Sequence, residues 1–400
     1  MRILTLSELL YPHGSGAELA TSLWIKFLAQ SGFEVRVITS IFPGEPQKST
    51  SGRLEIFRLP LVGSSSQKYR LLGRSHMLFS SFFRKSLEWA DLVYVPRFWY
   101  SAIPIAKGYR KPVVTHLHDY IPICSLATRY DLSKNQKCTS TVQCRPSCVI
   151  AHERAQGRPF PQTYGSALLN LGIWPCVGRW VLLSDAIVCV SEAHRDTLTS
   201  RMPSLLRKCR LIHNLLPEIA ATPIEGKDFG YFGGSKRLKG YNVLARAICR
   251  TRAPMTIHAT TFEGRTRIDF ANGSRLFFYG RLPELEYEGL YRTIRTVVVP
   301  SIWAEPLGYV VSEAIMRGRL VIASKVGGIP EQTAQCPGAF LVPPNDDLRL
   351  AELMEFATGL GKEAASDLAL RSREVFRTRF DNSRIAERFV NLLQQLMSVK

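Results

Sequence analysis

The sequence has no hydrophobic run long enough to cross a bilayer, which takes about 18 residues. Its richest apolar stretch, residues 168–190, is interrupted by Pro175, Arg179 and Asp185. Its start has a short apolar run and no small-residue cleavage site, and this predicts a first β-strand instead of a signal peptide. We therefore expect a cytoplasmic protein.

Acidic residues are in short supply: 33 Asp and Glu accompany 52 Lys and Arg, which gives a net charge of +19 over 400 residues. The excess is uneven, because residues 1–216 hold 27 basic and 13 acidic side chains, a balance of +14. Such an excess attracts nucleic acid, anionic lipid or phosphorylated substrates, and it also serves solubility. The rest of the composition, 46% hydrophobic and 10% aromatic, is typical of a globular enzyme and excludes a disordered or fibrous chain.

Strand-like and helix-like segments alternate along the chain. Apolar runs occur at 2–6, 34–39, 92–95, 113–116 and 186–190, and after a proline-containing linker they resume at 229–232, 256–258, 276–279, 296–300 and 320–323. Strands that alternate with helices form parallel sheets covered on both faces. The sequence therefore predicts an α/β protein of two Rossmann-like doubly wound domains facing a cleft. The domains span 1–215 and 216–382, and a C-terminal helix at 383–400 can cross back to the first domain.

The densest chemical signal lies between residues 296 and 331. Glu305 follows an apolar run, and Glu313 stands eight positions later on a predicted helix that opens with Pro306 and Gly308. Two carboxylates in this arrangement can each accept a pair of hydroxyl hydrogen bonds, one pair from a sugar and one from a ribose. The N–H groups at the start of the helix can bind an anion.

This block, together with Ser301, Gly327, Gly328 and Glu331, resembles the signature of the family 4 (group 1) retaining glycosyltransferases, which have the GT-B fold. Similar stretches run along nearly the whole chain, at residues 1–4, 14–18, 32–35, 118–120, 184–191, 213–214, 233–240 and 279–280. The resemblance implies an acceptor-binding first domain with a Cys-containing insertion at about 120–165, and a second domain that binds a nucleotide-diphosphate sugar. It places the donor sugar on Glu305 and the nucleotide ribose on Glu313, and it implies no catalytic metal.

The resemblance also implies a donor site that reaches both domains: Gly16, Gly233, Gly234, Arg237, Lys239, Gly280, Pro306, Leu307, Gly308 and Glu313. One position departs from the family pattern, because an Arg often stands where this chain has Gly234. Lys239 keeps its place and can neutralise the leaving diphosphate without a metal ion. Lys236, Arg237 or the backbone N–H groups of 233–235 would replace the missing Arg.

His118 follows a predicted strand of the first domain. Histidine can exchange hydrogen bonds with a sugar hydroxyl and stabilise charge near the anomeric carbon. The resemblance implies that His118 contacts the donor sugar, so the predicted catalytic residues are His118, Lys239 and Glu305. Asp119 and Tyr120 are predicted to orient the loop or the acceptor. Gly16, at the start of the first helix, would let a diphosphate or acceptor approach the backbone.

Two other classes of function remain open at this point. Gly14 and Gly16 follow a strand as in a dinucleotide fingerprint, but Leu19 stands in place of the third glycine and no acid closes the second strand. A nicotinamide-dependent oxidoreductase is therefore one alternative. A non-catalytic membrane or nucleic-acid binder on the same fold is the other, although no nucleic-acid motif is present and no such partner is expected.

Cys124, Cys138, Cys144 and Cys148 form a C-x13-C-x5-C-x3-C pattern after His118. Four thiolates can hold a structural zinc ion in a tetrahedral site, but the pattern lacks a tight C-x2-C pair. Free thiols are the alternative, and disulfides are least favoured in a reducing compartment. We expect no cofactor for catalysis and keep zinc as a structural hypothesis.

Residues 56–87 carry no acid and six basic residues, interleaved with Leu and Phe at helical spacing: Arg58, Lys68, Arg70, Arg74, Arg84 and Lys85. Such a segment is typical of a helix on an anionic membrane surface, with Phe82 and Phe83 inserted, or of an ordinary helix with an apolar core face.

Taken together, the sequence predicts transfer of a hexose-type sugar from a UDP- or GDP-sugar to a glycan or lipid-linked acceptor. We expect this reaction to belong to bacterial-type surface glycan synthesis, with peripheral membrane contact.

Overall fold

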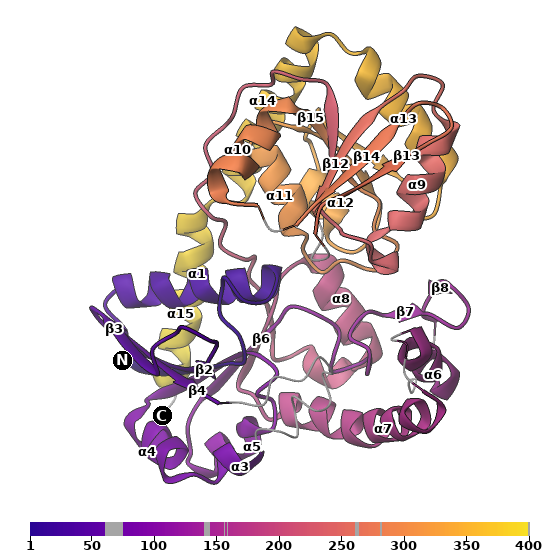
Figure 1. Ribbon diagram of the computed structural model, residues 1–400. Helices are drawn as coiled ribbons and strands as arrows, with labels where there is room; N and C mark the ends of the chain where they lie inside the picture. Colours follow the sequence, from indigo (N-terminus) through magenta and orange to yellow (C-terminus); the bar gives the residue numbers. More distant parts are fainter. Residues whose placement is uncertain are drawn as a thin grey trace. The chain divides into compact units, whose positions relative to one another are not determined.

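The computed structural model describes residues 1–60, 75–139, 145–155, 157, 159–260, 264–280 and 282–398. Its contacts divide the chain into two compact units, residues 1–215 with 382–400, and residues 216–381 (Figure 1). Each unit is built on one large sheet with helices packed on it. Among the described helices, none is both long and apolar enough to cross a membrane.

The first unit has an eight-stranded sheet in the order β10-β9-β6-β5-β1-β2-β4-β3. Every neighbouring pair is parallel except β3 and β4. Its strands are β1 (Arg2–Ser7), β2 (Glu34–Ser40), β3 (Lys48–Ser51), β4 (Leu54–Leu59), β5 (Leu92–Arg97), β6 (Val113–Leu117), β9 (Ala186–Cys189) and β10 (Cys209–Leu211). The short strands β7 (Tyr130–Asp131) and β8 (Gln136–Lys137) form a separate ribbon. Its helices are α1 (Gly16–Gln30), α3 (Ser75–Leu78), α4 (Ser81–Trp89), α5 (Ala102–Gly108), α6 (Pro146–Ala155), α7 (Phe160–Leu182), α8 (Glu192–Arg201), the 3-10 turn η1 (Pro203–Leu205) and α15 (Asn382–Ser398).

The second unit has a seven-stranded sheet in the order β13-β14-β12-β11-β15-β16-β17, parallel except for β13 against β14. Its strands are β11 (Asp228–Tyr231), β12 (Thr256–Thr260), β13 (Thr266–Asp269), β14 (Arg275–Tyr279), β15 (Ile294–Val299), β16 (Leu320–Ser324) and β17 (Ala339–Val342). Its helices are the 3-10 turn η2 (Arg237–Lys239), α9 (Tyr241–Arg250), α10 (Glu284–Thr293), α11 (Tyr309–Met316), α12 (Ile329–Thr333), α13 (Asp347–Gly359) and α14 (Lys362–Arg379).

The central strands are short, continuous apolar runs because helices cover both faces of each sheet. All residues of β6, β15 and β16 are buried, as expected for parallel strands inside a doubly wound sheet. The carboxyl ends of such strands gather on one edge, where loops and helix N-termini present ligand-binding groups. These two sheets confirm the predicted α/β doubly wound architecture.

The C-terminal helix α15 belongs to the first unit, although the second unit precedes it in the chain (Figure 1). Its Phe389 is fully buried, with ring-centroid distances of 4.4 Å to Trp24 and 5.5 Å to Tyr94. Burial of an aromatic side chain of this size contributes roughly 2–3 kcal/mol. The last helix is therefore part of the core of the first unit.

Helix α4 is a core helix, which contradicts the predicted insertion of Phe83 into a membrane. Phe83 is fully buried and stacks on Trp99 at 6.2 Å, while Phe82 packs against Phe57 at 5.1 Å. Arg84 and Lys85 of this helix are exposed. Lys68, Arg70 and Arg74 lie outside the described residues.

Candidate active site

Glu305 is a buried carboxylate in the loop between β15 and α11, with 5% of its surface exposed. Its Oε1 accepts three hydrogen bonds, from Lys239 Nζ at 2.6 Å, Ser301 Oγ at 2.8 Å and Trp303 Nε1 at 2.9 Å. Within the part of the chain that the structure describes, Oε2 has no donor. Three donors on one oxygen fix the side chain and leave the second oxygen with the capacity to accept further hydrogen bonds.

The loop that carries Glu305 rests against the turn before α12. Gly328 donates its N–H to the carbonyl oxygen of Glu305 at 2.8 Å. Gly327 has a φ of +52°, and a Cβ there would overlap this carbonyl oxygen and lie 2.7 Å from the backbone N and C of Glu305. Only glycine combines this left-handed conformation with such a close approach. The two glycines therefore set the position of the Glu305 backbone.

Gln332 of α12 fixes the other end of the loop. Its fully buried side chain accepts the N–H of Gly308 at 3.0 Å and donates to the Gly308 carbonyl at 3.0 Å. The expectation that the Gly308 N–H is free for an anion is therefore wrong, since Gln332 already occupies it. Among the described residues, the N–H groups of Leu307 and Val310 have no protein acceptor, so these two groups can still bind an anion at this helix start.

Lys239 reaches Glu305 from the glycine-rich turn after β11. A Cβ at Gly233 would lie 2.5 Å from Tyr231 Oη and 2.8 Å from Lys239 Cβ, so glycine makes room for the turn to fold back. Gly234 follows with a φ of +62°. Lys236 and Arg237 are both exposed. Partial desolvation and the positive charge of Lys239 lower the pKa of Lys236, so Lys236 lies close enough to act with Lys239 on an anion.

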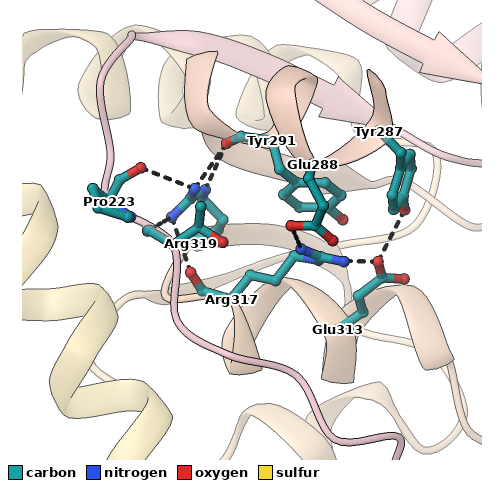
Figure 2. A network of polar contacts seen from close by, with 8 residues as sticks. Pro223, Tyr287, Glu288, Tyr291, Glu313, Arg317 and Arg319 are labelled. Atoms are coloured by element: carbon teal, nitrogen blue, oxygen red, sulfur yellow. Dashed lines mark hydrogen bonds and ion pairs between the residues drawn. The ribbon is translucent and has the colours of Figure 1, made fainter. Parts of the chain in front are cut away.

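Glu313 lies on α11 and is also held at one oxygen (Figure 2). Its Oε1 accepts hydrogen bonds from Tyr287 Oη at 2.9 Å and from Arg317 Nε at 3.2 Å. Arg317 also donates to Glu288 Oε2 at 2.6 Å. Burial opposes the charge of Arg317, but the carboxylates of Glu288 and Glu313 outweigh it and raise the pKa of the guanidinium. This network keeps a charged arginine beside Glu313.

Arg319 is the buried neighbour of this network (Figure 2). In the part of the chain that the structure describes, its guanidinium donates to backbone carbonyls alone, at 2.6–3.2 Å: those of Thr222, Pro223, Tyr291, Arg317 and Gly318. Burial without a carboxylate partner lowers the pKa of Arg319 to about 10. The side chain ties residues 222 and 223 to α10 and to the turn before β16.

The first unit gathers its own polar cluster at the carboxyl ends of β5 and β6. His118 stacks on His116 at 4.4 Å, and burial, with the neighbouring positive charges, holds the pKa of His118 well below its usual range. His118 is therefore neutral at pH 7, with an Nε2 that has no partner among the described residues. Asp119 accepts the N–H of Ile121 at 3.0 Å and lies 3.9 Å from Arg97 Nε.

The N-terminus of α1 already holds a carboxylate. The carboxylate of Glu18 accepts a hydrogen bond from the N–H of Ser15 at 2.7 Å and forms an ion pair with Arg97 at 2.5 Å. Ser15 directly precedes Gly16. This capping box argues against a second anion at Gly16, because like charges at one helix N-terminus repel. Tyr120 is fully buried against His194, at 5.0 Å between ring centroids. That burial argues against a direct acceptor contact by the Tyr120 side chain.

The cysteine pattern gives no metal site among the described residues. Cys124, Cys138 and Cys148 form no disulfide with one another, and burial raises the pKa of the Cys148 thiol to about 11 in the metal-free protein. In the described ranges no three His, Cys, Asp or Glu side chains could hold a metal ion. Cys144 lies outside those ranges, and the zinc hypothesis has no support from the other three.

Several residues that build the site were not predicted from the sequence. Tyr287 and Arg97 are far in sequence from the carboxylates that they hold, and Gln332 is 24 positions from the Gly308 backbone that it holds. Trp303 lies two positions before Glu305, but no pattern predicts that its indole N–H donates to that carboxylate. Arg317 could have been found, because an Arg four positions after Glu313 on a helix predicts an ion pair. Two residues predicted to bind the donor sugar nucleotide are placed as follows: Gly280 comes directly after β14, and Pro306 is buried next to Glu305 in the chain.

Comparison with known proteins identifies the family. Residues 14–216, half of the chain, match the family model described as Glycosyltransferase Family 4, and residues 226–357 match Glycosyl transferases group 1. This chain belongs to Glycosyltransferase Family 4. This membership confirms the family resemblance seen in the sequence and excludes the alternative of a nicotinamide-dependent oxidoreductase.

Relatives of this Family 4 chain are distant in sequence. Glycogen synthase of Mycobacterium tuberculosis is 26% identical over 260 residues, which cover 60% of this chain and 59% of the relative's length. Sucrose-phosphate synthase from Thermosynechococcus elongatus has a TM-score of 0.72 at 18% identity over the whole of both chains. Anabaena HepE, solved in complex with UDP-glucose, has a TM-score of 0.63 at 18% identity over 99% of this chain and all of HepE. These structures establish the GT-B fold.

Proposed function

We propose that this Family 4 chain transfers a sugar from a nucleotide-diphosphate sugar to an acceptor hydroxyl. The observation that carries the proposal is the pair of carboxylates Glu305 and Glu313, each held at Oε1 and each with no donor on Oε2 among the described residues. Two carboxylates with one oxygen left over suit the hydroxyls of a sugar and of a ribose. The complex of HepE with UDP-glucose supports a nucleotide sugar as the donor class.

Lys239 is the proposed group for the leaving diphosphate. Its ammonium has three N–H donors and, among the described residues, one hydrogen-bond partner, Glu305. The remaining donors can bind phosphate oxygens together with the N–H groups of Leu307 and Val310. We expect this positive group to stabilise the departing diphosphate without a metal ion.

We propose that the anomeric configuration is retained. The acceptor oxygen would form its bond to the anomeric carbon on the same face from which the diphosphate leaves, and a leaving phosphate oxygen would take the acceptor's proton. His118 is proposed to contact the donor sugar as a neutral hydrogen-bonding group, which agrees with the lowered pKa that burial gives it. Asp119 is proposed to hold the loop in place through its hydrogen bond to Ile121.

The first test separates nucleotide binding from transfer. Thermal stabilisation by UDP, GDP and ADP identifies the nucleotide, because a ligand that binds only the native state raises its stability. Glu313→Ala is expected to weaken nucleotide binding and to lower kcat/KM through a raised KM, since a ribose contact exists in both ground and transition states. Glu305→Ala is expected to keep nucleotide binding and lose transfer. Equal losses for both variants in both assays would contradict this division of roles.

We propose that the acceptor is a lipid-linked or surface glycan, in agreement with the bacterial-type glycan synthesis that the sequence predicts. We propose that the protein reaches this acceptor by peripheral contact with an anionic membrane. The surface that supports it is on α7, which packs on α6 (Figure 1). Phe160, Tyr164 and Leu168 form a stripe at four-residue spacing, and they are 72%, 39% and 75% exposed. Arg154 donates to the hydroxyl of Tyr164 at 2.9 Å, so a positive charge lies beside this apolar stripe.

Co-sedimentation with vesicles of varied anionic content tests this surface. Phe160→Gln with Leu168→Gln is expected to weaken binding at least tenfold, because two exposed apolar side chains lose their burial in lipid. Leu348→Gln with Leu370→Gln, which are 59% and 52% exposed on the second unit, is the matched control. Binding that ignores both the α7 change and the lipid charge would overturn the membrane proposal. Self-association without lipid would assign the face to a second copy instead.

A further inference from the structure

Glu313 is held by one residue from another helix and by one close neighbour in the chain. Tyr287 comes from α10, and Arg317 directly follows the last residue of α11 (Figure 2). Both donate to the same oxygen, Oε1. The carboxylate therefore has one oxygen in the protein network, and Oε2 has no donor among the described residues.

Arg317 is itself fixed on three sides. Its side chain is 9% exposed, its Nη1 donates to Glu288 Oε2 at 2.6 Å, and its guanidinium carbon lies 4.4 Å from the centre of the Tyr291 ring and 5.5 Å from that of Tyr287. A guanidinium with free nitrogens pairs with a carboxylate through both oxygens. Here Glu288 accepts from Nη1 and Glu313 accepts from Nε, and among the described residues no hydrogen bond joins Nη2 to Glu313 Oε2.

We propose that Tyr287, Arg317 and Glu288 are positioning residues that keep Glu313 Oε2 open for the vicinal hydroxyls of the nucleotide ribose. Tyr287 and Arg317 hold Oε1, and Glu288 anchors the Arg317 guanidinium through Nη1 in the orientation that leaves Oε2 without a donor among the described residues. This inference rests on the proposed function, because it requires a nucleotide on Glu313. It adds residues that control nucleotide affinity without touching the nucleotide.

The burial of the network explains why it can act through geometry. Burial, with the charge of Glu313, raises the pKa of Tyr287, so its hydroxyl stays a donor at physiological pH. The pKa of Arg317 is raised as well, so the arginine stays charged. Neither donor changes its protonation near neutrality, and the arrangement is expected to bind the ribose equally well from pH 6 to 8.

The test measures affinity for a ribonucleoside diphosphate and for its 2′,3′-dideoxy analogue by titration calorimetry. Wild type is expected to prefer the ribonucleotide by at least tenfold, as a hydrogen bond to a charged group predicts. Tyr287→Phe, which removes one hydroxyl, is expected to reduce this preference about threefold to tenfold. Arg317→Gln and Glu288→Gln are expected to reduce it to near unity, with KM for the donor raised and kcat little changed.

Arg371→Gln is the matched control, because Asp367 and Arg371 form the same i,i+4 ion pair at 3.3 Å with the arginine 65% exposed. It is expected to leave the preference unchanged. Wild-type preference in all three network variants would overturn the inference while the proposed function stands. A wild-type protein that binds none of UDP, GDP and ADP would overturn the proposed function itself. An equal loss of ribo- and dideoxynucleotide binding would assign the network a merely structural role.

Discussion

Replacing Gly327 by alanine tests whether the turn before α12 places Glu305. The new Cβ would lie 2.7 Å from the backbone N and C of Glu305, where an ordinary carbon contact takes about 3.5 Å. The loop must therefore move by about 1 Å or the turn must open. A displacement of about 1 Å at a reacting group costs on the order of a hundredfold in rate. We expect Gly327→Ala to lose about a hundredfold in kcat.

The same substitution also carries a conformational cost that is separate from the collision. A left-handed φ of +52° costs an alanine about 1–2 kcal/mol. Gly318→Ala supplies the matched control, because its φ is +69° and its nearest neighbour, Leu370 Cδ2, is at an ordinary 3.5 Å. Gly318→Ala is expected to lose about 1–2 kcal/mol of unfolding free energy. Gly327→Ala is expected to lose more, because the collision adds to this cost, and it alone is expected to lose turnover.

The assay follows hydrolysis or transfer of the nucleotide sugar whose nucleotide stabilises wild type best, with urea unfolding in parallel. Wild-type kcat in Gly327→Ala would refute the argument that this turn positions Glu305. A hundredfold loss in Gly318→Ala as well would refute it too, since backbone strain alone would then explain the effect.

Two further predictions concern stability. Burial lowers the pKa of His194 to about 4, against 6.5 in the unfolded chain, so the unfolded state binds more protons between these values and the native state loses stability as the pH falls from 7 to 5. His194→Gln is expected to remove about 2 kcal/mol of that loss. Unfolding is followed by tryptophan fluorescence, because five of the six tryptophans lie in residues 1–215. An unchanged pH dependence of stability would contradict the lowered pKa of His194. Arg319→Met is expected to cost about 3–5 kcal/mol, because five carbonyls lose a buried donor. Urea unfolding followed by circular dichroism, with the exposed Arg371→Met as control, checks this, and a loss below 1 kcal/mol would show that water replaces the guanidinium.

The local features of the site could be predicted from the sequence. The apolar run 296–300 and the helix after Gly308 are encoded by neighbouring residues, because a strand or a helix depends on contacts within a few positions. The capping pair Ser15 and Glu18 has the same local character. The family signature around Glu305 and Glu313 added the expected roles of both carboxylates.

Contacts across long sequence distances could not be predicted in this way. Sequence patterns did not show that the N–H of Gly308 is taken by Gln332, 24 positions away. They also left open whether the aromatic residues of α4 face solvent, and tertiary packing places Phe83 in the core. The zinc hypothesis depended on four cysteines meeting in space, which spacing alone does not determine.

The sequence by itself determined the alternation of strands and helices, the family and the two carboxylates, because these follow from local periodicity and from a compact motif. Tertiary structure alone decided which oxygen of each carboxylate is engaged and by which donor. Lys239 and Glu305 are 66 positions apart, and Tyr287 and Glu313 are 26 apart. Such pairs meet only because parallel strands bring their carboxyl ends to one edge of the sheet, and that topology is a property of the whole folded unit.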